Sequence, residues 1–508
     1  MNKVLLLSDQ PFQTNFQIDL AQRLVESGVD CRIATVDTYL FLYNPGLIER
    51  AKKATNRPVH TLEHCFRHWQ AKGEPEMEGV EDFLTSWELQ NCRRRSLAEL
   101  ERTNNTLFAD ERSDYMLSVS ESWRKRILYD SILWCEQVLD ETKPDLIFSV
   151  DHCTLPTNLL YEKSLSLGVP FMTLQNTRIQ NRWVIREDFF LGMDSKTLLE
   201  AQNCLLDEDS RKEAEGYLAQ YKASSKSTYY ALAHSQSMLS PRVKNLDKLG
   251  FHFRKLLLGV LDAFFRITTK RPVTYRIRRL EQQFTKLSLW ELRGLLRIAL
   301  YDLGHGDFGL KEPPAQTYMF WALHFRPEGS VLVLGKGKDE IATLRQHASK
   351  LPEGCYLLVK EHPLMFGYRS KGFYKDLASI PNVRLVDPFA DSKKFLESSA
   401  GAIGMSGTIL LEARLLGIPA WSFGEPEFLP FLSGNGEQDF SEFVEQVAKG
   451  TWSDKSENIL AYLSFVFKNS SKDDSAINEL LRPYELANLA GDLGRVSSKI
   501  IERLQEVS

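Results

Sequence analysis

Side chains that could hold a phosphate group follow two apolar runs in the C-terminal half of the sequence. Residues 356–359 end at Lys360 and His362, and residues 401–405 end at the Ser-Gly-Thr turn of residues 406–408. Short apolar runs of this kind are typical of buried strands in a parallel sheet, and such sheets bind ligands beyond the carboxyl ends of their strands. Lys360 and His362 would add positive charge there. The two runs therefore predict a phosphate site, with solvated strand ends as the alternative.

The second turn should open a helix. Apolar residues recur with helical spacing over residues 409–416, and either Ser406 or Thr408 can cap the helix. Gly407 has no Cβ, so a ligand can approach the backbone closely. A helix N-terminus with free N–H groups binds anions. Glu412 lies one turn after Thr408 on the same face, where it either accepts hydrogen bonds from a ribose or is an exposed helix residue.

The elements that must position these residues alternate between strand and helix in both halves of the chain. The pattern predicts an α/β fold of two Rossmann-like domains, the GT-B architecture. We expect residues 1–310 to form an N-terminal acceptor domain with a helical insertion at 195–300, and residues 311–508 to form a nucleotide-sugar-binding domain with terminal helices. Residues 303–314, with three glycines and two prolines, should be a linker. The last helix, near 487–506, could pack back on the first domain.

Three residues just beyond other predicted strands are candidates for acid–base or nucleophilic catalysis. Asp151 and His152 follow a strand in the N-terminal half, and Glu328 follows one in the C-terminal half. Transfer to an acceptor needs a group that takes the acceptor proton or forms a covalent intermediate. The alternatives are that Asp151 caps the next turn and that Glu328 forms a salt bridge with Arg326 within a loop.

Four further residues are candidates for binding the substrate. His324 and Arg326 follow the strand that precedes Glu328, while Arg178 and Arg182 follow a strand of the N-terminal half and could bind an acidic sugar. We expect no metal site and no cofactor, because the helix N-terminus and the cations can neutralise a departing phosphate.

The bulk composition is that of a globular protein with more than one domain. The chain has 508 residues, 43% of them apolar, and a net charge of −4, which argues against a general nucleic-acid-binding protein. The seven cysteines are scattered without a Cys-x-x-Cys pair, which favours a reducing compartment. The first apolar run is too short for a signal peptide, and no window reaches the length of a membrane span. These features predict a cytoplasmic protein.

Basic residues far outnumber acidic ones over residues 241–300, where apolar runs alternate with the charges. A basic amphipathic helix can lie on an anionic membrane surface, which would make the protein peripheral on the inner face of the cytoplasmic membrane. The alternative is a solvated helical face over a core.

Several motifs in a fixed order resemble the capsular polysaccharide biosynthesis family, which is similar to bacterial Kdo transferases. The motifs lie within residues 140–190 and 315–425 and read Phe-Trp-Ala-Leu-His-Phe-Arg-Pro-Glu from 320, Leu-Pro-Glu-Gly from 351, Val-Lys-Glu-His-Pro from 359, Gly-Tyr-Arg from 367, Ser-Gly-Thr from 406, and Gly-Ile-Pro from 417. The resemblance implies a GT-B fold and a CMP-activated sugar such as Kdo.

The sequence thus predicts a glycosyltransferase of bacterial surface polysaccharide assembly, of capsule or O-antigen type. Its substrates would be a nucleotide-activated donor, carrying Kdo or another acidic sugar, and a glycan or glycolipid acceptor. Three alternatives stay open: a polyol-phosphate transferase of teichoic-acid type, a sugar-nucleotide 2-epimerase, and a non-catalytic scaffold of a capsule assembly complex.

Overall fold

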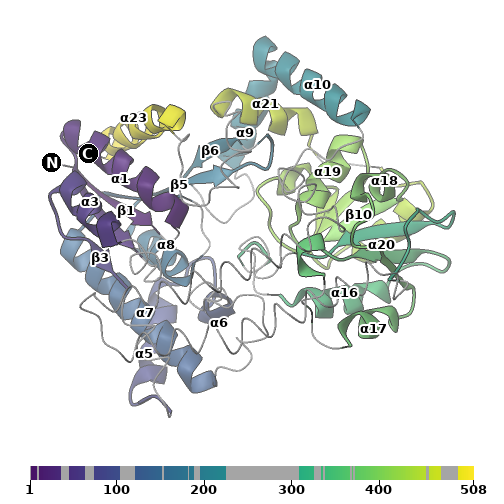
Figure 1. The fold of residues 1–508 in the computed structure, drawn as a ribbon, viewed down its shortest axis with the longest axis horizontal. Coiled ribbons are helices and arrows are strands. Elements are labelled where there is room, and N and C mark those ends of the chain that lie inside the picture. The colour runs from purple at the N-terminus through teal and green to yellow at the C-terminus, as the bar shows by residue number, and fades with distance from the viewer. Residues whose placement is uncertain are drawn as a thin grey trace, which may run out of the picture.

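The computed structural model describes most of the chain (Figure 1). The described residues are 2–507 apart from 9–10, 36–44, 63–73, 103–119, 151–153, 181, 188–194, 225–307, 325–332, 336–337, 367–368, 370–371, 454–456 and 471–489. Within them the chain forms two six-stranded sheets, each covered by helices. The predicted fold class, an α/β protein of two Rossmann-like units, is confirmed.

The first sheet has the strand order β3-β2-β1-β4-β5-β6. Its strands are β1 (Lys3–Ser8), β2 (Asp30–Thr35), β3 (His60–Thr61), β4 (Leu146–Val150), β5 (Phe171–Asn176) and β6 (Trp183–Arg186). All neighbouring pairs are parallel except β5 and β6. Alternate residues of β1 face opposite layers of helices, so Leu5 and Leu7 belong to one core and Val4 and Leu6 to the other.

The second sheet repeats this topology. Its order is β12-β11-β10-β7-β8-β9, which, counted from its own first strand, is the same 3-2-1-4-5-6 order as in the first sheet. Its strands are β7 (Tyr318–Ala322), β8 (Tyr356–Lys360), β9 (Val383–Val386), β10 (Gly401–Gly404), β11 (Ala420–Ser422) and β12 (Gly434–Asn435), and all pairs are parallel. Again Tyr318 and Phe320 enter one core, and Met319 and Trp321 the other.

Each sheet is covered by helices that come mainly from its own half of the sequence. The first sheet is covered by α1 (Pro11–Glu26), α3 (Pro45–Thr55), α5 (Val80–Asn91), α6 (Leu97–Arg102), α7 (Glu121–Thr142) and α8 (Leu155–Leu167). Around the second sheet lie α16 (Glu340–Ala348), α17 (Phe373–Ala378), α18 (Ser392–Glu397), α19 (Thr408–Leu416), α20 (Phe440–Ala448) and α21 (Ile459–Asn469).

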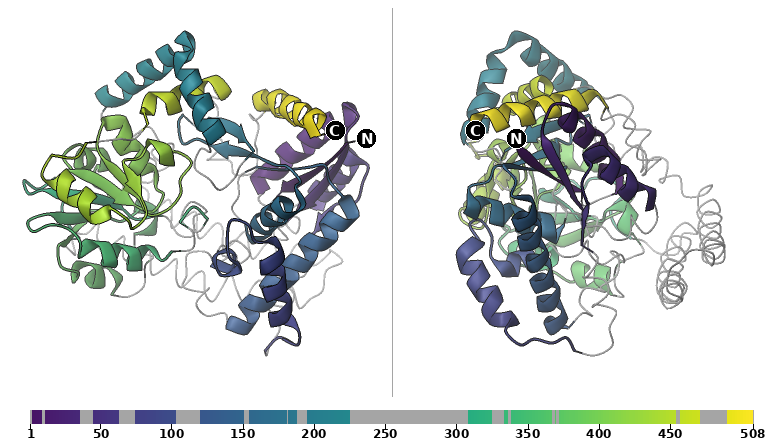
Figure 2. Two further views of the ribbon diagram at one scale, coloured as in Figure 1. Left: turned by 180° about the vertical axis from the view of Figure 1, so that it is seen from behind. Right: turned by 90° about the vertical axis from the view of Figure 1, so that its left-hand side faces the viewer.

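Two sets of helices pack against the sheet that the other half of the sequence forms. Helix α23 (Ala490–Val507) packs on α1, so the C-terminal helix returns to the first sheet as predicted (Figures 1 and 2). Helices α9 (Ser195–Leu206) and α10 (Glu208–Ala223) pack with α21 in the core of the second sheet. The first part of the predicted helical insertion is therefore helical, and its remainder lies outside the described residues. The proposed domain boundary near residue 310 stays a prediction.

Candidate functional site

The phosphate-site turn lies between β10 and α19, where the sequence predicted it. Gly407, not Ser406 or Thr408, is the N-cap residue, and no side chain caps the helix. The expectation of a hydroxyl cap is therefore wrong. Gly407 has φ −68° and ψ 153°, an extended conformation that any residue adopts, so its lack of a side chain matters for space alone. Without a side-chain cap, the N-terminus of α19 keeps its capacity to bind an anion.

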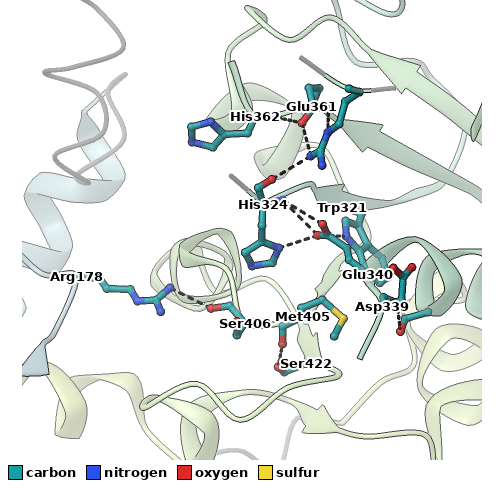
Figure 3. Close-up of polar contacts among 12 residues, drawn as sticks. Arg178, Trp321, His324, Asp339, Glu340, Glu361, His362, Met405, Ser406 and Ser422 are labelled. Carbon is teal, nitrogen blue, oxygen red and sulfur yellow. Dashed lines mark hydrogen bonds and ion pairs between the residues drawn. The ribbon is translucent and has the colours of Figure 1, made fainter. Parts of the chain in front are cut away.

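His324 points at this turn from the end of β7. The side chain is buried, and its Nδ1 atom lies 2.7 Å from Oε1 of Glu340, the first residue of α16. A Cβ on Gly407 would lie 3.1 Å from Nε2 of His324, so the imidazole edge faces the glycine directly. Figure 3 shows the ring between Glu340 and Ser406. Among the described residues Nε2 has no hydrogen-bond partner.

A buried ion pair supports His324 from the other side. Arg369 donates two hydrogen bonds to Glu361, from Nε to Oε2 at 2.7 Å and from Nη2 to Oε1 at 2.9 Å. Its Nη2 atom also donates to the carbonyl of His324 at 3.0 Å, and the hydroxyl of Tyr374 donates to Glu361 at 3.0 Å. Burial is the largest single influence and lowers the pKa of Arg369, but the charge and hydrogen bonds of Glu361, together with Glu340 and Tyr374, outweigh burial and raise this pKa above its usual value. The pair thus fixes the backbone that carries His324.

The structure gives Lys360 and His362 less positive charge than their types suggested. Nζ of Lys360 donates to the carbonyl of Pro388 at 2.8 Å, and burial lowers its pKa to about 8. Burial, reinforced by the charge of Lys360, lowers the pKa of His362 to about 3, so the imidazole is neutral at neutral pH. The expectation that His362 adds positive charge at neutral pH is wrong for the ligand-free protein.

A third cation reaches the turn from the other sheet. Arg178, in the loop after β5, donates from Nη1 to the carbonyl of Ser406 at 3.0 Å and to Oγ1 of Thr408 at 3.3 Å. Its Nε atom pairs with Glu427 at 3.0 Å, and Arg178 itself has a left-handed φ of 63°. The carboxyl ends of the two sheets therefore face each other and touch at this residue, which is the GT-B arrangement.

Arg182, four residues later, lies elsewhere. Its guanidinium bonds to Glu213 on α10 at 2.8 Å and to Ser470, just after α21, at 3.2 Å. It also lies 4.6 Å from the ring centroid of Phe467. The structure thus brings Arg178, but not Arg182, to the α19 turn.

Of the remaining candidate site residues, the structure describes one, Glu412, and leaves four undescribed. Glu412 is buried on α19, so the alternative of an exposed helix residue is wrong. Asp151, His152, Arg326 and Glu328 lie outside the described residues, as does the basic stretch 241–300. Their roles stay predictions.

Two carboxylates of the site were missed at the sequence level. Glu340 and Glu427 bind His324 and Arg178, and neither lies directly beyond a strand end. Glu340 did carry a signal, because an Asp-Glu pair before an apolar helical pattern marks a helix start. Within the described part of the chain, no group of three or more His, Cys, Asp or Glu side chains is arranged to hold a metal ion.

Comparisons with known proteins give structural matches with low TM-scores only. No protein-family model matches the chain, and no curated protein shows significant similarity to it. Among solved structures, the calicheamicin glycosyltransferase CalG4 is 12% identical, with 96% of this chain and 99% of that chain covered and a TM-score of 0.28. The KpsC beta Kdo 2,4 transferase of Thermosulfurimonas dismutans is 11% identical, with 66% and 87% covered and a TM-score of 0.32.

A third similar structure is the UDP-GlcNAc 2-epimerase of Neisseria meningitidis bound to UDP-GlcNAc. It is 11% identical, with 94% of this chain and 100% of that chain covered and a TM-score of 0.25. Every one of these TM-scores is below 0.5, so the functional proposal depends on the site of this chain. No helix in the described residues is long and apolar enough to cross a membrane.

Proposed function

We propose that the protein is a glycosyltransferase of bacterial surface polysaccharide assembly, of capsule or O-antigen type. It transfers a sugar, Kdo or another acidic sugar, from a nucleotide-activated donor to a glycan or glycolipid acceptor. The observation that carries the proposal is the uncapped N-terminus of α19, which meets the guanidinium of Arg178 and the Nε2 atom of His324, unpartnered within the described part of the chain. An anion that enters this turn would meet a helix dipole, an imidazole and a fixed positive charge.

This set of groups suits the departing phosphate of a nucleotide sugar. In glycosyl transfer, negative charge develops on the phosphate as the bond to the sugar breaks, so donors placed at the phosphate lower the barrier. Ser406, Gly407 and Thr408 provide the turn, and Glu412, on the same helix, is our candidate for the ribose. His362 would act as a neutral hydrogen-bonding group, and Lys360 would hold the strand end by its bond to Pro388.

The acceptor side of the reaction is assigned to the first domain and the loop after His324. Asp151, His152 or Glu328 would take the acceptor proton or form a glycosyl intermediate. Residues 241–300 would hold the enzyme at an anionic membrane surface, close to a glycolipid acceptor.

The first test is a thermal-shift screen with CMP, CDP, UDP and GDP, because a ligand at 100 times its Kd stabilises the folded state by about 2.7 kcal/mol. The matched pair of variants is Arg178→Gln and Arg182→Gln. Only the first should weaken nucleotide binding, whereas the second should lower stability alone, because Arg182 bonds to helices away from the turn. A wild-type protein that binds none of the four nucleotides would refute the proposal.

The second test separates the reaction types. The bound nucleotide's sugar donor is incubated with the enzyme with and without a glycan acceptor. A transferase should consume the donor only with acceptor, apart from slow hydrolysis. Isomerised sugar without acceptor would identify an epimerase instead, transfer of a polyol phosphate would identify the teichoic-acid type of enzyme, and binding without turnover would favour a scaffold.

A further inference from the structure

The carboxylate of Glu340 is buried and accepts hydrogen bonds from Trp321 and His324. The donors are Nε1 of Trp321 at 3.4 Å, the backbone N–H of His324 at 3.2 Å, and Nδ1 of His324 at 2.7 Å (Figure 3). The side chain has no solvent exposure, and its residue lies in the first turn of α16, where a negative charge is favoured. Opposite a carboxylate, which can only accept hydrogen bonds, Nδ1 of His324 is the donor, so the neutral ring carries its proton on Nδ1.

This contact fixes the state of the other ring nitrogen. With the proton on Nδ1, Nε2 carries a lone pair in the neutral ring and becomes a donor when the ring takes up a second proton. Nε2 has no partner among the described residues and faces Gly407 at the start of α19. With both ring nitrogens protonated, the ring would form an ion pair with the carboxylate of Glu340, and Nε2–H would be a charge-assisted donor toward the turn.

We propose that Glu340 is the positioning residue for His324: it fixes the ring with Nε2 toward the α19 turn and lets the ring bind a nucleotide phosphate as an imidazolium. This inference rests on the proposed function, in which that phosphate occupies the turn. Binding then couples to proton uptake: the ring gains one proton from solvent, and Nε2–H donates to a phosphate oxygen. No bond other than the N–H bond forms.

The other charged and titratable groups around His324 limit what else can take up the proton. They are Arg369 and Glu361, already paired; His362, neutral at neutral pH; Arg178, from the loop after β5; and Lys360, at the end of β8. Arginine stays protonated at any working pH, and His362 is neutral at pH 8 in the ligand-free protein, where its pKa is about 3. Lys360, with its pKa of about 8, is the other group that can take up a proton at this pH. The His324→Gln variant distinguishes its contribution from that of His324.

The experiment measures nucleotide affinity and proton uptake by calorimetry at pH 8 in buffers of different ionisation enthalpy. The probes are CMP and UDP, with cytidine and uridine as phosphate-free controls, and the phosphate of CMP is then a dianion. The variants are Glu340→Gln, His324→Gln and the double variant, with Trp321→Phe as the matched control that removes a different hydrogen bond to Glu340. Thermal unfolding in each case confirms that the variant is folded.

We expect Glu340→Gln to weaken nucleotide affinity by about 10–100-fold, by analogy with the hydrogen-bond partners of metal-ligating histidines, and to lower proton uptake to the level seen in His324→Gln. Nucleoside affinity should not change, and Trp321→Phe should behave as wild type. In the His324→Gln background, Glu340→Gln should add little, because Glu340 acts through the ring. Uptake in His324→Gln equal to that of wild type would belong to Lys360 and would overturn the inference.

Two failures are distinguishable. If wild-type protein binds neither nucleotide, the proposed function fails and the inference with it. If wild type binds a nucleotide and Glu340→Gln binds it equally well with the same proton uptake, the inference alone fails. Should Glu340→Gln unfold, Glu340→Asp serves in its place: the shorter carboxylate keeps the charge, so proton uptake should persist at reduced affinity, and its loss would count against the proposal.

Discussion

The two ends of helix α16 each hold a buried histidine, and the two sites differ in what surrounds the ring. At the first end, His324 bonds through Nδ1 to the carboxylate of Glu340 at 2.7 Å. At the other end, His347 bonds through Nδ1 to the carbonyl of Thr343, also at 2.7 Å. In both rings Nε2 has no hydrogen-bond partner among the described residues. Burial and an unpartnered nitrogen therefore do not by themselves mark a functional histidine.

The difference lies in the group behind Nδ1 and in the space before Nε2. The ring of His347 lies 4.0 Å from the centroid of Phe423 and 4.9 Å from that of Phe440, and burial lowers its pKa. It acts as a neutral aromatic residue of the core. His324 has a carboxyl group behind it and a helix N-terminus in front of it. The carboxylate is thus the feature that distinguishes the proposed binding site at His324 from the packed core around His347.

The largest effect on stability should come from breaking the Arg369–Glu361 ion pair, which supports His324 at the first end of α16. Arg369→Ala leaves Glu361 as an unpaired buried charge and should lower the free energy of unfolding by about 3–5 kcal/mol. Denaturant unfolding with an unchanged m-value measures this loss. The control is Tyr374→Phe, which removes one hydrogen bond to the same carboxylate and should cost about 1 kcal/mol. Equal losses in the two variants would mean that the ion pair does not fix this end.

Replacing each histidine with alanine should affect a different property: stability at His347 and nucleotide binding at His324. His347→Ala opens a cavity among aromatic rings and should lower the free energy of unfolding by about 2–5 kcal/mol without changing the nucleotide affinity of the folded protein. His324→Ala should weaken nucleotide binding roughly tenfold or more, because it removes a charge-assisted hydrogen bond. Unfolding and calorimetric titration of both variants provide the measurements. A loss of affinity in His347→Ala would end the distinction between the two sites.

Local sequence patterns were enough to predict the fold because strands and helices are set by short-range periodicity. The runs that became β8 and β10, and the helix that became α19, lie where the spacing of apolar residues placed them. Strands β3, β6 and β12 were not predicted, because each is two to four residues long and lies at a sheet edge, where few apolar residues are needed.

The site was predictable only in part, because its contacts join residues far apart in sequence. Arg178 meets Ser406 across 228 positions, and nothing local distinguishes it from Arg182, which bonds to Glu213 instead. The left-handed backbone of Arg178 and the start of β6 one residue after Arg182 send the two side chains to different neighbours. Charge was mispredicted for the same reason: the burial that keeps His362 neutral is a tertiary property.

The pH dependence of stability should report the titration of Lys360, the buried lysine at the end of β8. Lys360 has a pKa of about 8 in the folded protein against 10.5 for the free side chain, so the unfolded chain binds more protons between these values. Stability should therefore rise as pH increases from about 8 to 10.5, by at most about 1.4 kcal/mol per pH unit. Lys360→Met should lack this rise, and the difference between the two unfolding curves removes contributions from other groups. Parallel curves would show that burial does not depress the pKa of Lys360.

The smallest predicted effect tests the space between His324 and the helix. In Gly407→Ala the new Cβ lies 3.1 Å from Nε2 of His324, so the ring must shift by a few tenths of an ångström away from the position that Glu340 fixes. We expect nucleotide affinity to fall roughly tenfold, about 1.4 kcal/mol. Stability should stay level or rise by up to about 1 kcal/mol, because alanine tolerates this backbone conformation.

The control for this variant is Gly404→Ala, whose Cβ would meet Leu410 at an ordinary 3.9 Å and approach no group of the site. It should bind nucleotide as wild type does. The double variant Gly407→Ala with His324→Ala decides the cause, because the methyl group then has no ring to displace and should cost nothing further. If Gly407→Ala weakens binding equally with and without the ring, the methyl group is excluding the phosphate from the helix itself. His324 would then lie beside the anion site without contributing to it. Like His347, it would be a buried histidine without a role in nucleotide binding.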